Sequence, residues 1–521
     1  MMRKRLVAMA FAMSAMLATF AQGKAEKPAT TEKKDDGPVP ITMLIETQAV
    51  QVDKSSPIMQ MIDTKYNIDL DAWELDPKKF DEQLNVRFAG GEMPDVFTTD
   101  TTANLPSYVE GGIAAEIPVS LIREKAPHYA EAVDRIDPTI WDAMTYNGKN
   151  YGYAQPMAIY PMAVFWNQNW LDKLGLQPPT TLEEMEKVLL AFVNDDPDGD
   201  GKNDTAGMAE RTFGAVFGAY GVRCVTGGNT GFKVEEMQLD EQGLPFFPYI
   251  TERAKEALTL LHKWYELGIV DKEFVTGENH GGYSWDSHSF MNGRIGVTCA
   301  QPSHYFMTSL DDSDPKNLGR CMRDYKAIDP NAKVTIGPAP IGPYGDQGTE
   351  AWAPVGKLVV VTQKAMEDPR KIDAILKMLD DFYADPDFAM MLTYGIKDVD
   401  WKETPYGPVR LTDGKEARRK GIIQFGYGNT AVFAAQARQA QDSFGKSVTQ
   451  HGYPRILVPN VPEFSNCIAT LDTLTEQAYY DMITGTKPMS YFDTFVQEFK
   501  AAGGEAAEKA IREAAAAKMK H

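Results

Sequence analysis

Apolar residues in the N-terminal part of the chain follow two alternating patterns. Short apolar runs at 41–45 and 68–75 have the length of strands, whereas the segments at 58–66 and 80–88 repeat apolar residues with helical spacing. Two glycines and a Pro-Asp pair follow the second helical segment, and such residues end a helix and turn the chain into a strand. Strands that alternate with helices predict an open α/β sheet.

Longer amphipathic helices follow further along the chain. Residues 182–193 carry apolar side chains on one face, and Thr181 with Glu184 forms the sequence pattern of a capping box at the start of this helix. Further helices are predicted at 170–174, 254–267, 369–383, 472–483 and 491–499. The Ala-, Glu- and Lys-rich tail at 505–520 predicts a weakly anchored helix, and the prolines and glycines of 336–343 predict a linker or hinge.

The first 40 residues differ in composition from the rest of the chain. Basic residues at 3–5 precede an apolar stretch at 6–20, so we expect residues 1–23 to be a cleaved signal peptide. Residues 24–40 begin with a run of Lys, Glu, Thr, Asp and Pro, which predicts a disordered leader. No cysteine near the cleavage region offers a site for a lipid anchor. The mature protein is therefore expected to be periplasmic or secreted.

Charge and motif content exclude several classes of function. The formal net charge of −20 argues against nucleic acid and anionic membrane surfaces as partners. The sequence contains no G-x-S-x-G, H-E-x-x-H or P-loop motif, which favours a binding protein over an enzyme. The four cysteines form no C-x-x-C pair; three disulfide pairings remain open, and buried free thiols are the favoured interpretation.

The most specific local pattern is an acidic loop directly after the predicted helix at 182–193. Positions 1, 3, 5, 7 and 9 of a calcium loop are matched by Asp196, Asp198, Asp200, Lys202 and Asp204. Position 6 is Gly201, which allows the sharp turn, and position 7 would contribute its backbone carbonyl. Position 12 holds Gly207 instead of the usual glutamate, so the remaining oxygens would come from water, backbone or Thr205. We predict a structural calcium site; the alternative is a solvated acidic turn.

Several segments together resemble a known family. The motifs are a small-Gly-x-x-Pro-Asp segment at 88–96, an extended crossing and helix at 160–181, a helix–turn–strand at 290–297, a Gly-Ile segment at 395–401 and C-terminal helices at 479–504. In combination they resemble the extracellular solute-binding proteins of ABC importers, the family of the maltose- and alginate-binding proteins. The acidic loop is similar to that of the alginate-binding members, which carry calcium after the same helix.

The resemblance implies an α/β architecture of the two-lobed, type II periplasmic-binding-protein fold, with hinge strands between the lobes. It implies an N-terminal lobe formed by 41–158 and 345–400. The C-terminal lobe would be formed by 163–335 and 405–515 and would carry the calcium loop. A solute would be captured between the lobes and delivered to the membrane subunits of an ABC permease by a monomeric binding protein.

The resemblance also implies a carbohydrate ligand, because flat aromatic side chains stack on sugar rings and carboxylates bind hydroxyl groups. Trp401 matches the stacking aromatic of the family. The other candidates for the ligand site are Trp285, Trp352, Tyr160, Thr99 and Asp100. Lys397 stands where the family has glutamate, which suggests an acidic sugar such as a uronate if this segment lines the cleft. The alternative is a lysine that faces solvent.

Three other functions remain open at this point. The ligand could be a peptide or another small solute. The chain could instead be a secreted polysaccharide-degrading enzyme that calcium stabilises, or a calcium sensor. A search for new reducing ends after incubation with polysaccharides separates the enzyme from the binding proteins.

Overall fold

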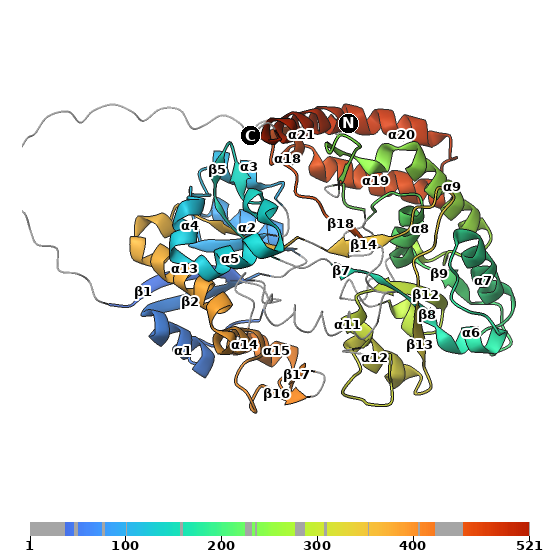
Figure 1. The fold of residues 1–521 in the computed structure, drawn as a ribbon, viewed down its shortest axis with the longest axis horizontal. Coiled ribbons are helices and arrows are strands. Elements are labelled where there is room, and N and C mark those ends of the chain that lie inside the picture. The colour runs from blue at the N-terminus through green and yellow to red at the C-terminus, as the bar shows by residue number, and fades with distance from the viewer. Residues whose placement is uncertain are drawn as a thin grey trace, which may run out of the picture. The chain divides into compact units, whose positions relative to one another are not determined.

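The computed structural model describes residues 37–45, 50–75, 79–99, 102–156, 160–224, 232–234, 237–276, 287–306, 310–352, 354–404, 407–422 and 452–519 (Figure 1). The described residues from Pro38 onwards form one compact unit. The predicted signal peptide lies outside the described residues. The predicted leader ends two residues too late, because Val39 and Pro40 already belong to the first strand, β1. Within the described ranges, no helix is long and apolar enough to cross a membrane.

The first sheet has the strand order β2-β1-β3-β15-β6. Its strands are β1 (Val39–Ile45), β2 (Ile68–Glu74), β3 (Val96–Thr99), β6 (Gly152–Pro156) and β15 (Val355–Val361). The first three are mutually parallel, and β15 runs antiparallel to both β3 and β6. This confirms the predicted alternation of strands and helices in the N-terminal part of the chain.

Helices cover this sheet and complete the first hydrophobic cluster. They are α1 (Pro57–Tyr66), α2 (Phe80–Ala89), α3 (Leu105–Glu110), α4 (Val119–Lys125), α5 (Pro127–Ile136), α13 (Pro369–Ala384), α14 (Pro386–Tyr394) and α15 (Gly414–Arg419). Helices α4, α5 and α13 lie side by side. The predicted helix that starts at Pro369 is confirmed as α13, with Ile375, Leu376 and Leu379 fully buried.

A buried ion pair links three elements of the first cluster. Asp95, directly before β3, accepts hydrogen bonds from the Thr42 backbone N–H of β1 and from Lys371 Nζ of α13, both at 2.7 Å. Its side chain is 0% exposed and that of Lys371 is 10% exposed. The Pro94-Asp95 segment therefore fixes α13 to the sheet.

The second sheet has the strand order β13-β8-β12-β9. Its strands are β8 (Ala163–Asn167), β9 (Ala206–Met208), β12 (Ile295–Ala300) and β13 (Val334–Gly337). Strands β9 and β12 are parallel, whereas β8 is antiparallel to β12 and β13. The prediction of a linker at 336–343 is wrong at its start, because Ile336 and Gly337 pair with Phe165 and Val164 in this sheet.

The second hydrophobic cluster surrounds this sheet with helices from three parts of the chain. They are α6 (Gln168–Leu174), α7 (Leu182–Asn194), α8 (Phe213–Ala219), α9 (Glu252–Glu266), α10 (His288–Met291), α11 (Pro302–Tyr305), α12 (Arg320–Ile328), α18 (Pro462–Ser465), α19 (Ile468–Ile483), α20 (Tyr491–Phe499) and α21 (Glu505–Lys518). The C-terminal helix is not weakly anchored as predicted, because Ala507 and Ile511 are 0% exposed.

The capping box at the start of α7 differs by one residue from the sequence pattern. Thr181 Oγ1 accepts a hydrogen bond from the Glu184 N–H at 3.2 Å, as predicted. The Glu184 carboxylate, however, accepts from the backbone N–H and the hydroxyl of Thr180, at 2.8 and 2.6 Å. The reciprocal bond therefore goes to the residue before the N-cap.

A separate three-stranded sheet joins the segments that run between the two clusters. Its order is β18-β14-β7, with β7 (Tyr160–Pro161), β14 (Thr349–Trp352) and β18 (Gly452–Pro454). Along the chain, β7 lies between β6 of the first sheet and β8 of the second, and β14 lies between β13 of the second sheet and β15 of the first. Strand β14 pairs antiparallel with β7 and parallel with β18. Segments far apart in the sequence thus cross between the clusters side by side (Figure 1).

The boundary expected at residue 405 does not match the hydrophobic clusters. Ala417 and Ile422 pack with the first cluster, although we predicted that 405–515 belongs to the second lobe. Helix α15 is held there because the Ser56 hydroxyl donates to the Lys420 carbonyl and the Asp53 N–H to the Arg419 carbonyl, both at 2.7 Å.

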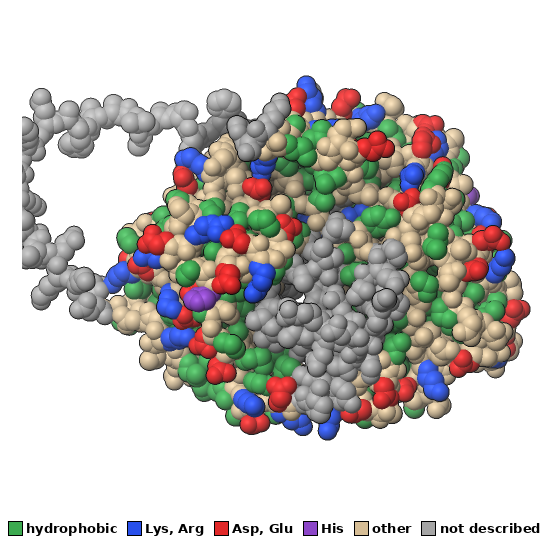
Figure 2. All heavy atoms as spheres, viewed as in Figure 1, with side chains coloured by type: hydrophobic (Ala, Val, Ile, Leu, Met, Phe, Trp, Pro, Cys, Tyr) green, Lys and Arg blue, Asp and Glu red, His purple; other side chains and the backbone are tan. Residues whose placement is uncertain are grey.

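The cysteines and the charged side chains at the surface agree with the expectations from composition. Cys224, Cys299, Cys321 and Cys467 are free and buried, which confirms the favoured interpretation of the cysteines. On the face shown in Figure 2, acidic and basic side chains are interspersed among the described residues.

Short strands form hairpins elsewhere: β4 (Thr145–Tyr146) with β5 (Lys149–Asn150), β10 (Gln238–Leu239) with β11 (Pro245–Phe246), and β16 (Trp401–Thr404) with β17 (Gly407–Arg410).

Candidate functional site

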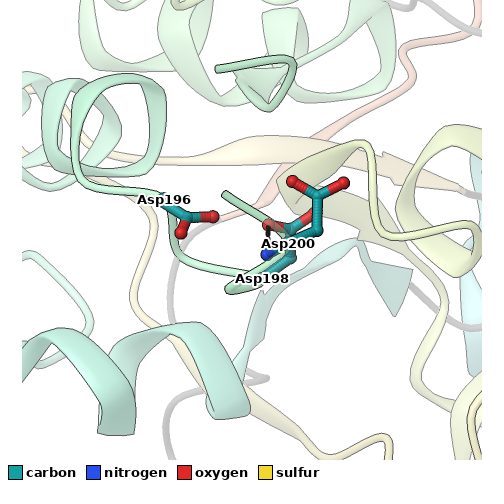
Figure 3. A group of neighbouring side chains, drawn as sticks. All are labelled: Asp196, Asp198 and Asp200. Atoms are coloured by element: carbon teal, nitrogen blue, oxygen red, sulfur yellow. Dashed lines mark hydrogen bonds between the residues drawn. The ribbon is translucent and has the colours of Figure 1, made fainter. Parts of the chain in front are cut away.

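Three carboxylates converge in the loop between α7 and β9. Asp196, Asp198 and Asp200 each offer an oxygen atom, and these atoms lie within 4.8 Å of one another (Figure 3). Asp196 is half-buried and the other two are exposed. Hard oxygen donors at this spacing suit a calcium ion, so the donor set fits the predicted metal.

The loop is built by hydrogen bonds between its own carboxylates and backbone. Asp196 accepts from the N–H groups of Gly199 and Gly201, at 3.0 and 3.3 Å, and Asp200 Oδ1 accepts from the Lys202 N–H at 2.8 Å. Gly201 has a φ of +78°, in the left-handed region that glycine adopts without strain. This conformation is the one that the predicted role of Gly201 requires.

The charges of the loop are only partly balanced by the protein. Although the Asp198 side chain is largely exposed, partial loss of hydration of its carboxyl raises its pKa, and the neighbouring charges of Asp196 and Asp200 raise it further. The Lys202 ammonium bonds to Asp200 and lowers the pKa of that carboxyl. Lys202 therefore contacts the cluster through its side chain in this structure, whereas its backbone carbonyl was the predicted ligand.

The structure brings together only part of the predicted ligand set. Among the described residues, the carboxylate cluster contains Asp196, Asp198 and Asp200 but not Asp204. The Thr205 hydroxyl is buried and donates to the Phe192 carbonyl of α7 at 2.7 Å. Thr205 thus ties the end of the loop to the helix before it.

The strand registers define a second location, at the carboxyl ends of the parallel strands. Thr99 ends β3 and pairs with Leu358, near the start of β15. Ala300 ends β12 and pairs with Ala163, at the start of β8. Because β14 precedes β15 and β7 precedes β8, the carboxyl edges of both sheets adjoin the crossing strands. Ligands of open α/β sheets bind at such carboxyl edges.

The predicted ligand residues are distributed unevenly around this location. Thr99 lies at the carboxyl edge and its side chain is buried. Tyr160 and Trp352 pair with each other in the crossing sheet, between β7 and β14, but their side chains lie outside the described part of the structure. Asp100 and Trp285 lie outside the described residues altogether.

Trp401 and Lys397 lie together in the turn that follows α14. Trp401 is 6% exposed, and its Nε1 donates to the Gly395 carbonyl at 3.0 Å. Lys397 is exposed, and its Nζ lies 5.6 Å from the centroid of the Trp401 ring. The buried Asp400 holds the turn closed by accepting from Lys420 Nζ at 2.7 Å and from the Ile396 N–H at 3.0 Å.

Polar residues a few positions after β9 and β12 escaped prediction from the sequence. Glu210 and Arg211 follow β9 in the short 3₁₀ helix η3 (Glu210–Thr212), and Gln301 and His304 follow β12. The sequence offers little sign that these residues lie at the end of a strand, because a strand of three residues such as β9 is too short to show an alternating pattern.

Burial dominates the electrostatics of these residues. Burial lowers the pKa of Arg211, although the nearby carboxylates of Glu350 and Glu210 act in the opposite direction. Burial, together with the positive charges of Arg320 and Arg211, lowers the pKa of His304 to about 4. Glu210 accepts a hydrogen bond from the Tyr480 hydroxyl at 2.6 Å. The carboxyl edge of the second sheet therefore carries the buried Glu210 together with the half-buried Arg211 and His304.

Comparisons with known proteins identify the class of this chain. Residues 75–368 match the family described as bacterial extracellular solute-binding protein. The polygalacturonan/rhamnogalacturonan-binding protein YtcQ of Bacillus subtilis (strain 168) is 25% identical over 459 residues, which cover 84% of each chain. The fructooligosaccharide ABC transporter substrate-binding protein FusA of Streptococcus pneumoniae serotype 4 (strain ATCC BAA-334 / TIGR4) is 24% identical over 234 residues, 42% of this chain and 41% of that one.

Solved structures share the fold over nearly the whole chain. The alginate-binding protein AlgQ2 without calcium ion superposes with a TM-score of 0.68 at 16% identity, over 92% of this chain and 98% of that one. FusA of S. pneumoniae in complex with kestose superposes with a TM-score of 0.64 at 17% identity, over 93% and 99% of the two chains.

The chain belongs to the family of bacterial extracellular solute-binding proteins, since the family match spans more than half of it. The fold is the α/β type II periplasmic-binding fold, as the sequence predicted. Membership also confirms the prediction that this protein binds a solute and is not an enzyme.

Proposed function

We propose that this protein is the solute-binding component of an ABC importer and captures an oligosaccharide between two lobes. The observation that carries the proposal is the position of the crossing strands, which adjoin the carboxyl edges of both sheets. Two matched relatives are named for saccharides, polygalacturonan or rhamnogalacturonan in one case and fructooligosaccharides in the other. A signal peptide at 1–23 exports the chain, which then acts outside the cytoplasm as a monomer.

Each lobe is formed around one of the two hydrophobic clusters. The first lobe contains 39–156 together with 355–422, and the second contains 163–337 together with 456–518. A solute with contacts to both lobes binds the closed arrangement more tightly than the open one, so binding shifts the population towards closure. The membrane subunits of the permease would then distinguish the closed form from the open one.

The ligand site in this proposal combines residues from both lobes. Thr99 and Asp100 of the first lobe and Arg211 and Gln301 of the second lie at, or directly follow, the carboxyl ends of strands. The remaining contributors are Tyr160, Trp285, Trp352 and Lys397, whereas the largely buried Trp401 lies next to Lys397 and supports its position. The aromatic rings stack on sugar faces, and the polar groups bind hydroxyl and carboxylate oxygens.

Calcium has a structural role in this proposal, with Asp196, Asp198 and Asp200 as the central ligands. The negative charge of this loop, which Lys202 balances only in part, supports a bound cation. The loop connects the end of α7 to the start of β9, both elements of the second lobe. Calcium therefore stabilises the second lobe and does not touch the solute.

A thermal-shift screen of the mature protein tests the proposed ligand class. The panel consists of oligogalacturonates, neutral fructooligosaccharides and short peptides, each with calcium and with a chelator. A true ligand at about 100 Kd contributes roughly 2.7 kcal/mol to stability, which gives a clear rise in Tm. Stabilisation by peptides but by no saccharide would overturn the proposal.

The Lys397→Ala variant tests whether the solute is acidic. If Lys397 pairs with a sugar carboxylate, its removal weakens binding of an oligogalacturonate by about tenfold or more, as expected for a charge-assisted hydrogen bond. Binding of a neutral fructooligosaccharide should stay within about twofold. Lys402→Ala is the matched control, because Lys402 is an exposed lysine on the adjacent strand β16. Equal losses for both ligands would remove Lys397 from the site.

A further inference from the structure

The crossing sheet is bonded more extensively to the second cluster than its short strands alone suggest. The Met162 N–H, at the entrance to β8, donates to the Glu350 carbonyl of β14 at 3.0 Å. The Thr349 hydroxyl donates to the Met162 carbonyl at 2.8 Å. Strand β14 is therefore tied to the start of β8 on one side, and it pairs with β18 on the other.

One arginine of the second cluster binds both of these crossing strands at once. Arg223 lies in the loop after α8, and it is 3% exposed. Its Nε donates to the Tyr453 carbonyl of β18 at 2.9 Å, and its Nη2 donates to the Ala351 carbonyl of β14 at 3.2 Å. The two carbonyls belong to strands about 100 residues apart in the sequence, and a single guanidinium spans them.

The backbone around Arg223 is itself fixed. The Arg223 N–H donates to the Gln238 Oε1 at 2.9 Å, and Gln238 Nε2 donates to the Gly221 carbonyl at 3.1 Å. Strand β18 has a second bond to the same region, since the Tyr453 hydroxyl donates to the Gly218 carbonyl of α8 at 3.0 Å. These bonds fix the backbone of Arg223, so its guanidinium is held in place relative to the two strands.

We propose that Arg223 is a positioning residue of the hinge, which fixes β14 and β18 to the second lobe so that these crossing strands move with that lobe as one body. Opening and closing then bend the chain on the first-lobe side of the crossing sheet. The inference rests on the proposed division into two lobes, but its readouts require no solute. Its failure is therefore distinguishable from failure of the proposed ligand class.

An arginine suits this position because of the geometry of its hydrogen-bond donors. A guanidinium carries five N–H donors in a rigid planar fork, so it reaches two acceptors on neighbouring strands without loss of either. A lysine ammonium is a single donor centre on a flexible stem and cannot hold both carbonyls in the same way. The Arg223→Lys variant should therefore retain the charge but restore only part of the anchoring.

Hydrogen exchange and X-ray scattering of the calcium-loaded, ligand-free protein test this role. In Arg223→Ala, amides of peptides that cover 349–352 and 452–454 should exchange about tenfold faster or more, because hydrogen bonds to a charged donor are lost. The radius of gyration should rise as the lobes gain freedom relative to each other. Arg223→Lys should give intermediate exchange in both peptides.

The matched control is Arg294→Ala. Arg294 belongs to the same cluster and binds Asp271 with its Nε at 2.9 Å and its Nη2 at 2.7 Å, directly before β12 and thus at the opposite end of this strand from Ala300, which pairs beside the crossing strands. Its removal should lower global stability and leave the two hinge peptides and the radius of gyration unchanged. If Arg223→Ala does not fold, Gln238→Ala, which loosens the base of the arginine, provides the same readouts. Equal exchange in the hinge peptides of the Arg223 or Gln238 variant and of Arg294→Ala would overturn the proposal.

Discussion

The ion pair of Asp95 and Lys371 shows how much a single side chain contributes to the first lobe. Both charges are almost completely removed from water, and Asp95 also accepts the Thr42 N–H. Removal of one member of a buried pair leaves the other charge without compensation, which costs more than the pair itself contributes.

Lys371→Met should therefore destabilise the protein by about 3–5 kcal/mol, measured as the free energy of unfolding in urea. The matched control is Lys364→Met, because Lys364 is a half-buried lysine that bonds only weakly to the Thr42 hydroxyl, at 3.4 Å. We expect a loss below about 1 kcal/mol for the control. Similar losses for the two variants would show that the Asp95 charge is compensated in another way.

His304 makes the stability of the protein dependent on pH. Burial and the charges of Arg320 and Arg211 lower its pKa from the ordinary 6.5 to about 4. Between these two pH values, His304 is protonated in the unfolded chain but neutral in the folded protein. The contribution of neutral His304 to the free energy of unfolding is therefore fully present above pH 6.5 and is lost as the pH falls towards 4. At the lower limit the loss is about 3 kcal/mol.

The comparison with His304→Gln isolates this contribution. The variant has no imidazole to protonate, so the difference in unfolding free energy between wild type and variant should change across this pH interval and stay constant above it. Urea unfolding at several pH values measures the difference. A difference that does not depend on pH would contradict the assignment to His304.

At the scale of elements, the unit formed by α7, the acidic loop and β9 explains the unusual end of the calcium pattern. Gly207 lies in β9, and a Cβ atom there would come within 2.9 Å of the Leu189 Cβ of α7. The glutamate that ordinarily ends a calcium loop cannot be placed at this position without separating β9 from α7. Close packing of the strand on the helix thus accounts for the missing ligand.

Asp198→Asn should change stability in opposite directions with and without calcium. With a chelator, the variant removes a carboxylate whose pKa is raised by burial and by its acidic neighbours, so its Tm should equal or exceed that of the wild type. With calcium, the variant loses a ligand and should be stabilised much less than the wild type. Calorimetric scans under both conditions measure the two effects.

Asp204→Asn is the control for this prediction, since Asp204 lies outside the cluster of converging oxygens. It should reduce the calcium-dependent rise in Tm less than Asp198→Asn does. Ligand affinity measured below the melting temperature should stay nearly constant in both variants. A large loss of affinity in a folded variant would mean that the loop takes part in solute binding.

At the scale of the whole molecule, function depends on the crossing sheet that connects the two clusters. Addition of a saturating saccharide from the panel should reduce the radius of gyration, because the solute stabilises the closed arrangement. Small-angle scattering with and without the ligand measures this change. Binding without any change in the radius of gyration would show that the protein does not close on this solute.

The sequence by itself determined the local features of this protein. Alternating strands and helices, the helix that starts at Pro369 and the calcium-loop pattern were all readable, because each depends on residues close together in the chain. The family motifs added the fold class. The boundary between the first and second lobes near residue 405 was placed too early, since the attachment of Ala417 and Ile422 depends on contacts with residues more than 300 positions earlier.

Only the tertiary structure decided which distant residues meet. The pairing of β7, β14 and β18, the burial of Asp95 against Lys371, and the two carbonyls held by Arg223 join segments separated by roughly 100 to 300 residues. Local periodicity carries no information on such partners, because strand pairing and ion pairing depend on positions in space. The acidic loop shows the same division. Its spacing predicted a calcium site, whereas the packing of β9 on α7 explains why position 12 holds Gly207 and not a glutamate.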